Sequence, residues 1–421
     1  MKKLLGTSLI IFASYGMISS ADTITYGCQQ TDTSKSMCDY LDARWKEMTN
    51  GEHDSRRVDI PWDSNDQLAL MQQGFAVKSG DIDIFLVDVV WPGLIGEHLL
   101  NLNPYGGEEV LSKHIAGYAK NNTINGEVKA IPSFMDTGML YYRKDLLEKY
   151  GKQVPQTWDE LKETAQYIMD EERKAGNKNM WGYVFQGKAY EGLTCNALEW
   201  FVSYGAGHVI EPDGTISINN EEAAKALDVA ASFVGTISPD GVTGMTEEES
   251  RNVFQAGNAV FHRNWPYVWA LANGDDSPVK GKVAITAMPK GDANVSASAL
   301  GGWSNAANAY SKHPDLAAKF LFMMNDEESQ RKRYEIEGNN PTMSKLYDEP
   351  EFENAKVFLP AFENAEARPS SVTGARYNEV SNEIWNAAFN VITGKQDGKA
   401  AVADLEKRLK KIKEDSRNWK R

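Results

Sequence analysis

Residues that build metal and redox centres are scarce in this chain. Its 421 residues include three cysteines and six histidines, and neither a CxxC nor an HExxH motif occurs. The sequence therefore has no recognisable zinc or dithiol site, and we predict neither a metal nor a cofactor. The phosphate-binding motif GxxxxGK(S/T) is also missing, so we do not expect an ATPase of the P-loop type.

Positive charge is also in short supply. Lys and Arg total 45 against 59 Asp and Glu, which gives a formal net charge of −14. This balance argues against a protein that binds nucleic acid or an anionic membrane surface by neutralising charge. Hydrophobic residues make up 42% of the chain and charged residues 25%, which excludes a wholly disordered protein. Because single cores stop growing at about 250–300 residues, we expect two lobes.

Apolar runs of membrane-spanning length are absent from the sequence. Two lysines near the start precede the apolar run 4–18, and the small residues 19–21 follow it. This pattern predicts that residues 1–21 are a secretory signal peptide, cleaved after Ala21. A membrane anchor is the alternative, but the run is shorter than the ~20 residues that span a bilayer. We therefore expect an exported, periplasmic protein.

Export changes the interpretation of the three cysteines. Cys28 and Cys38 lie ten residues apart near the predicted mature N-terminus. In an oxidising compartment, this spacing predicts a local disulfide. Two unrelated buried residues are the alternative. Cys195 is the cysteine left over, and we expect a buried thiol there.

Strand and helix patterns alternate in the first part of the chain. Short strand patterns at 23–27 and 58–60 are each followed by an amphipathic helical pattern, and the apolar run 82–91 comes next. A nearly continuous apolar strand between helices is typical of a parallel sheet that is covered on both faces. A second unit begins near Phe134. We therefore predict open α/β sheets, which bind ligands beyond the carboxyl ends of their strands.

Aromatic residues are abundant, with 11 Trp, 17 Tyr and 15 Phe. Trp265 and Tyr267 flank a proline, and Trp303 follows Gly301 and Gly302. Aromatic faces in such loops can stack on the C–H faces of sugar rings, and glycines let the backbone approach a ligand closely. Most of the other tryptophans lie on helical stripes, and we expect them in the core.

Two acids stand at the ends of predicted strands. Asp88 ends a hydrophobic strand, and Asp136 precedes the strand at 138–142. We expect both carboxylates to face the cleft and to accept hydrogen bonds from sugar hydroxyls; a helix N-cap or a turn acid is the alternative. Paired acids also fit a secreted glycoside hydrolase, in which one acid protonates and the other attacks. That class is the alternative function, although no local motif pairs a nucleophile with a second acid.

Six motifs follow one another in an order that resembles a known family. They are IFLVDVVW at 84–91, DTGMLYYRKDLL at 136–147, VPQTWDEL at 154–161, FQAGNAVFHRNW at 254–265, LGGW at 300–303, and Arg368-Pro369 ahead of Tyr377. The set resembles the family 1 extracellular solute-binding proteins, the sugar receptors of bacterial ABC importers. It is most similar to their trehalose/maltose (α-glucoside) branch, and the resemblance spans almost the whole mature chain.

The resemblance implies a two-lobed α/β fold of the type II periplasmic-binding class. Each lobe is expected to be a mostly parallel sheet flanked by helices, with the ligand in the interlobe cleft. We expect an N-terminal lobe of residues 22–132 and 293–340 and a C-terminal lobe of 133–292 and 341–421. The implied function is reversible, non-enzymatic binding of a disaccharide such as trehalose, maltose or sucrose, which is delivered to membrane permease subunits. We expect a monomer without a nucleic-acid partner.

The resemblance also assigns individual residues to the sugar site. It matches Asp88 and Asp136 to acids that bind hydroxyls, Trp265, Tyr267 and Trp303 to stacking aromatics, Gly301 and Gly302 to close backbone approach, Arg368 (with Arg376 as the alternative) to a basic residue near the ligand, and Gln30 to a polar group after the first strand. The Cys28–Cys38 pair also matches the trehalose-binding subgroup.

Overall fold

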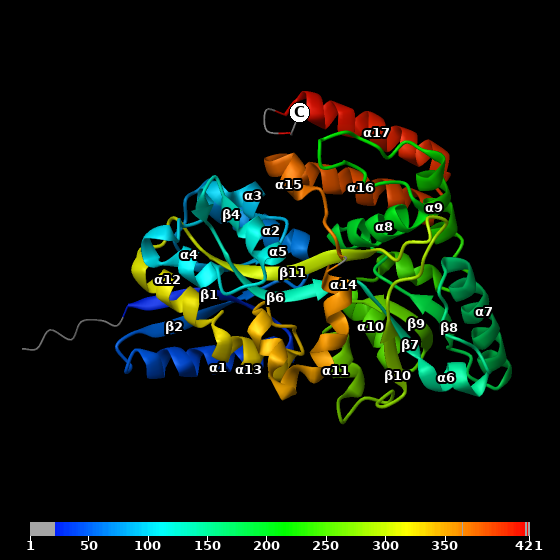
Figure 1. The fold of residues 1–421 in the computed structure, drawn as a ribbon, viewed down its shortest axis with the longest axis horizontal. Helices are drawn as coiled ribbons and strands as arrows, with labels where there is room; N and C mark the ends of the chain where they lie inside the picture. The colour runs from blue at the N-terminus through cyan, green and yellow to red at the C-terminus, as the bar shows by residue number, and fades with distance from the viewer. Residues whose placement is uncertain (1–21, 364, 417–418, 420–421) are drawn as a thin grey trace, which may run out of the picture.

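Two β-sheets, one in each lobe, organise the chain (Figure 1). The computed structural model describes residues 22–363, 365–416 and 419. The predicted signal peptide and its cleavage site after Ala21 lie outside these residues. Within them, no helix combines the length and the apolar character that crossing a membrane requires.

The first sheet has six strands and is mixed, with the predicted parallel pairing around β1 and antiparallel pairing on both sides of β11. Its strands are β1 (Thr23–Gln29), β2 (Asp54–Ile60), β3 (Ile84–Asp88), β6 (Ile131–Thr137), β11 (Ser298–Ala307) and β12 (Ala365–Glu366). β1 pairs in parallel with β2 and β3, and β12 pairs in parallel with β11. β11 runs antiparallel to β3 and β6. A separate hairpin joins β4 (Thr123–Ile124) to β5 (Glu127–Val128).

Helices cover both faces of this sheet. Ile84 packs with apolar side chains of α1 and α12, whereas its neighbour Phe85 packs with those of α2, because successive side chains of a strand point to opposite faces. The helices of this lobe are α1 (Asp32–Met48), α2 (Ser64–Ala76), α3 (Pro92–Ile95), α4 (Gly107–Leu111), α5 (Ala116–Ala119), α12 (Pro314–Met323) and α13 (Glu327–Glu337). Short 3₁₀ helices lie at Gly96–His98, Asn103–Tyr105, Lys120–Asn122, Ser344–Asp348 and Pro350–Phe358.

The second sheet is mostly antiparallel, which corrects our prediction of a mostly parallel sheet in each lobe. Its strands are β7 (Met139–Arg143), β8 (Trp181–Val184), β9 (Ala259–Asn264) and β10 (Val283–Thr286). β7 runs antiparallel to β9 and β10, whereas β8 and β9 are parallel. Apolar runs indicate that a strand is buried on both faces, but the long connections between these strands decide their directions.

Helices cover both faces of the second sheet as well. Leu140 packs with α7, α8 and α9, and its neighbours Met139 and Tyr141 pack with α10 and α11. These helices and those of the C-terminal segment are α6 (Lys144–Lys149), α7 (Trp158–Lys174), α8 (Glu191–Tyr204), α9 (Glu221–Ala231), α10 (Glu247–Gln255), α11 (Val268–Asn273), α14 (Leu359–Glu363), α15 (Ser370–Thr373), α16 (Tyr377–Ile392) and α17 (Gly398–Glu414), with 3₁₀ helices at Asp240–Gly244 and Gly374–Arg376. Figure 1 shows α16 and α17 stacked outside α8 and α9.

The chain passes between the two sheets at more than one place. The first passage is at Gly138, between β6 and β7, so the whole of β6 belongs to the first sheet although our boundary at 132/133 falls within this strand. β11 then returns the chain from the second lobe to the first (Figure 1). Met343 and Phe352 are buried with the first sheet, although they follow our boundary at 340/341. That the predicted residue ranges of the two lobes move as rigid units stays a prediction.

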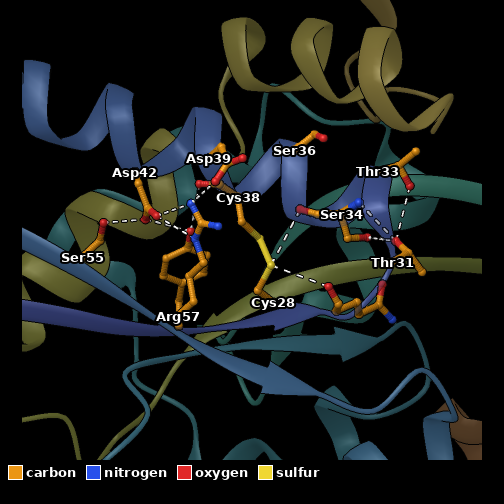
Figure 2. The surroundings of a disulfide bond; sticks show 12 residues. Cys28, Thr31, Thr33, Ser34, Ser36, Cys38, Asp39, Asp42, Ser55 and Arg57 are labelled. Carbon is orange, nitrogen blue, oxygen red and sulfur yellow. Dashed lines mark hydrogen bonds and ion pairs between the residues drawn. A yellow bond between two sulfur atoms is a disulfide. The ribbon is translucent and has the colours of Figure 1, made fainter.

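A disulfide ties the end of β1 to α1, as predicted (Figure 2). Cys28 lies in β1 and Cys38 in α1, with their Cα atoms 6.6 Å apart. Closing this short loop is expected to stabilise the protein by about 2–3 kcal/mol. Beside the bridge, Arg57 of β2 donates to Asp42 of α1 at 2.7 Å. The helix α1 is therefore held to both strands. Cys195 is a buried free thiol.

Candidate functional site

A cavity of about 540 Å³ lies where the two lobes meet. This volume falls within the ~300–1,000 Å³ typical of small-molecule sites. The predicted site residues that line it are Gln30, Asp88, Asp136, Trp265, Tyr267, Gly301, Gly302, Trp303 and Arg368. Arg376 is not part of this lining, and its guanidinium pairs with Glu379 at 2.7 Å. Of the two candidate arginines, the fold brings Arg368 to the cavity.

Arg368 is buried between two acids that come from different lobes. Its guanidinium nitrogens lie 2.9 Å from Asp88 Oδ1, at the end of β3, and 2.7 Å from Glu191 Oε1, at the start of α8. Asp88 Oδ1 also accepts from the backbone N–H of Val90 at 3.1 Å. Burial raises the pKa of Asp88, and the charge of Arg368 opposes that shift. One oxygen of Asp88 is therefore already engaged by the protein.

Asp136 presents a different picture. It is buried at the end of β6, and its Oδ1 has no hydrogen-bond partner among the described residues. Burial is the main reason that the pKa of Asp136 is raised to about 7. The Arg263 guanidinium opposes this shift, and the carboxylates of Asp88 and Glu247 add to it. Near neutral pH, this carboxyl can therefore either donate to or accept from a hydroxyl group in the cavity.

Trp265 is fixed by its neighbours before any ligand arrives. The Arg263 guanidinium lies 4.1 Å from the centre of the indole ring, and the indole N–H donates to Glu247 Oε1 at 3.3 Å. A Cβ atom at Gly301 would lie 2.8 Å from a ring carbon. We expected the missing side chain of Gly301 to make room for a ligand. In the structure, the edge of the Trp265 ring occupies that space.

Trp303 lies beside Asp88 on the neighbouring strand and packs edge-on against Trp91, with ring centres 5.4 Å apart. We expected Trp303 in a loop, but β11 continues through the two glycines before it. Gly302 has a φ of +109°, and a Cβ atom there would lie 2.6 Å from the carbonyl oxygen of Phe134. Gly302 is thus required by the approach of β11 to β6, and this approach presents Trp303 to the cavity.

Some cavity residues were not among our predicted site residues. Glu191 and Glu247 both line the cavity and are the first residues of α8 and α10. Acids at helix starts are common because they favour the helix dipole, so the sequence carried no separate signal for them. Trp62 also lines the cavity, and it follows Pro61 in a loop. A proline-flanked loop aromatic is the same signal that pointed to Trp265.

The lobes touch across the mouth of the cavity. Lys188 of the second lobe pairs with Asp63, the N-cap of α2, at 2.8 Å. Asn65, in the first turn of α2, makes a second contact between the lobes. Its side-chain oxygen accepts a hydrogen bond from the backbone N–H of Glu191 at 3.2 Å. These contacts hold the two lobes together around the cavity.

The chemistry of this arrangement suits an uncharged ligand that is rich in hydroxyl groups. Aromatic faces line the cavity, and the buried charges near it are largely paired with one another. Among the residues that the structure describes, no group of three or more His, Cys, Asp or Glu side chains could hold a metal ion.

Comparison with known proteins gives a consistent result. The sequence model described as bacterial extracellular solute-binding protein matches residues 40–331. A probable ABC transporter-binding protein of Deinococcus radiodurans is 41% identical over 404 residues, which cover 95% of each chain. Among solved structures, maltose-bound MalE3 of T. maritima has a TM-score of 0.88 and 33% identity, with 93% of this chain and 100% of that chain covered. The GacH receptor of Streptomyces glaucescens, at 23% identity, shares the fold with a TM-score of 0.82 over 94% of this chain and 100% of that one.

The raised pKa of Asp136 predicts a pH-dependent stability. The unfolded acid has a pKa of 3.8 and the folded one of about 7. The folded state therefore holds the proton more tightly, and this contribution to stability is complete below the unfolded pKa and is lost as the pH rises through the folded pKa. As the pH rises from about 5 to about 8, the free energy of unfolding of Asp136→Asn should increase by about 1–3 kcal/mol relative to that of the wild type. Urea unfolding at the two pH values measures this difference.

A control separates this effect from the loss of any negative charge. Asp276 is exposed in the turn after α11, and Asp276→Asn should not reproduce the gain expected of Asp136→Asn. If Asp136→Asn and wild type kept a constant difference in the free energy of unfolding at both pH values, Asp136 would not titrate in the folded protein as described.

Proposed function

We propose that this chain, which belongs to the bacterial extracellular solute-binding proteins and is the solute-binding component of an ABC sugar transporter, binds a disaccharide in the cavity between its lobes. Proteins of this family are transport binding proteins, whose partners are a sugar and the permease subunits of the transporter. Trehalose, maltose and sucrose are the candidate ligands. MalE3 of T. maritima binds maltose, which supports this class.

The observation that carries this proposal is the cavity lining. Trp265 and Trp303 offer indole faces that can stack on the C–H faces of sugar rings, and Asp136 has a buried carboxyl oxygen without a partner among the described residues. A sugar hydroxyl would satisfy that oxygen. Because a hydrogen bond to a carboxylate is about twice as strong as one between neutral groups, Asp136 would fix the orientation of the ring.

The mechanism we propose is closure of the two lobes around the sugar. A ligand that contacts both lobes in the closed form shifts the equilibrium toward closure, because its affinity for the two forms differs. Asp63 and Lys188 then meet across the cavity mouth. The closed receptor docks on the permease and releases the sugar there.

We further propose that no bond is broken in the cavity. Asp88 Oδ1 is held by Arg368 and by the backbone N–H of Val90, and the proteins of this family are transport binding proteins, both of which support binding without chemistry. The raised pKa of Asp136 is the property of a general acid, and it keeps a glycoside hydrolase as the second candidate function.

The proposal also covers the export of the protein and its oligomeric state. We propose that residues 1–21 are removed after Ala21 and that the mature protein works in the periplasm as a monomer, without a nucleic-acid partner. The extracellular character of the family supports export, and the net charge of −14 argues against binding to nucleic acid.

A thermal-shift screen of the mature protein tests the binding function. Trehalose, maltose or sucrose should raise the melting temperature, because a ligand that binds the folded state alone stabilises it. After incubation at high protein concentration the sugar should be recovered intact. Released glucose would favour the hydrolase, and the absence of any shift with all mono- and disaccharides tested would contradict the proposal.

Trp303→Ala should weaken sugar binding by about 1–3 kcal/mol, because it removes an indole face that stacks on the ring. Calorimetric titration with the sugar found in the screen measures the loss. Trp181→Ala is the matched control: Trp181 is partly buried and stacks on Arg173 at 4.5 Å, but it lies outside the cavity. Equal affinities for the two variants would remove Trp303 from the site.

Lys188 does not line the cavity, but its ion pair with Asp63 joins the two lobes and should favour the closed form. Lys188→Gln removes this pair and should weaken sugar binding about two- to fivefold. The loss should appear as faster sugar dissociation in stopped-flow measurements. Lys174→Gln breaks a comparable pair with Glu171 within α7 and should leave the rate unchanged. Identical dissociation rates for both variants would show that the Lys188–Asp63 pair does not influence closure.

A further inference from the structure

The cavity continues beyond the predicted sugar contacts into the first lobe. There it runs between the first sheet and the helices α1 and α13. We call this part the inner compartment, and define it by Leu86, Ser133 and Asn305 of the sheet and Met37, Arg333 and Glu337 of the helices, all of which line the cavity. Neither the family resemblance nor the predicted site residues account for it.

Two polar groups of the inner compartment have no partner among the described residues. Ser133 is 1% exposed and Asn305 is 3% exposed, and neither Ser133 Oγ nor Asn305 Oδ1 makes a hydrogen bond there. Buried polar groups are rarely left in this state, because each loses its hydrogen bonds to water on folding. Both residues line the cavity, so a ligand that entered the compartment could pair with these oxygens once the side chains turn toward it.

The backbone accounts for the position of Ser133. Along β11, the pairing jumps from Phe134 to Pro132 of β6 and leaves Ser133 without a partner in the ladder. Ser133 is thus the extra residue of a β-bulge, and bulges redirect the side chain that they carry. Asn305, on β11, lies opposite Leu86 of β3. The two polar groups therefore come from neighbouring strands of the same sheet.

The charges in the compartment neutralise each other. Arg333 pairs with Glu337 one helical turn away at 3.3 Å, and both side chains are mostly buried. The remaining lining groups are an alcohol, an amide and the apolar side chains of Met37 and Leu86. An uncharged pyranose ring, with hydroxyls on its edge and C–H groups on its faces, matches this lining, whereas an ion would meet no unpaired counter-charge in it.

We infer that one ring of the disaccharide enters the inner compartment and that Ser133 and Asn305 bind its hydroxyl groups. This inference rests on the proposed function. It makes the two residues specificity determinants, because a sugar that lacks the matching hydroxyl would leave buried polar groups unpaired. The first lobe then holds one ring in the compartment, while Trp265 and Trp303 are left to contact the other.

Ser133→Ala is the decisive variant, and the chain offers a closely matched control. Ser304, on the neighbouring strand β11, is also 1% exposed and its hydroxyl also lacks a partner among the described residues, but it does not line the cavity. Calorimetric titrations of the mature protein with trehalose, maltose and sucrose should show about three- to tenfold weaker binding for Ser133→Ala and wild-type binding for Ser304→Ala. Neither variant should melt earlier than wild type without sugar, because both remove an unpaired buried group.

Two further variants test the inner compartment independently of Ser133→Ala. Ser133→Val adds bulk to the compartment and should weaken binding more than Ser133→Ala does. Asn305→Ala tests the same compartment from β11 and should also weaken binding about three- to tenfold. Wild-type affinity for Ser133→Ala, Ser133→Val and Asn305→Ala, all folded, would overturn the inference and leave a compartment that holds only water. A wild-type protein that binds none of the three sugars would instead overturn the proposed function.

Discussion

The buried guanidinium of Arg368 joins the two lobes at the cavity. It is shared by Asp88, at the end of β3, and Glu191, at the start of α8, so that one cation binds an acid from each lobe. Removing three charged groups from water is costly, and such a cluster is stable only while every member stays paired. Tyr377 and Ser381 of α16 also donate to Glu191. The carboxyl end of the first sheet is therefore held in a defined position against the helices of the second lobe.

The rest of the site divides into groups that the protein satisfies and groups that it leaves open. Trp265 is positioned by Arg263 and Glu247, so little freedom remains to be lost when a ligand stacks on it. Asp136 and Ser133, by contrast, keep buried oxygens without partners among the described residues. Unpaired buried groups destabilise the folded protein, and such a cost is common where a protein recognises a ligand.

Much of the fold and part of the site could be predicted from local patterns. The alternation of strands and helices in the first lobe, the Cys28–Cys38 disulfide and the loop position of Trp265 each depend on residues close together in the sequence. Trp303, which we also expected in a loop, lies within β11. The direction of β7 in the second sheet could not be predicted, because its partners lie far along the chain. Glu247 and Ser133 were also missed, since a helix start and a bulge give no sign of facing a cavity.

Asp88 and Asp136 mark the limit between sequence and tertiary structure. The sequence by itself determined that Asp88 ends a strand, because side-chain alternation and the neighbouring apolar residues are local properties. Asp136, which we expected just before the strand at 138–142, lies near the end of β6. Only the tertiary structure decided that the two differ. Arg368, 280 residues after Asp88, folds back to pair with that acid, whereas Asp136 is buried without a hydrogen bond to its Oδ1 and its pKa is raised to about 7. The charge of a buried acid depends on which groups the fold brings beside it, however distant they are along the chain.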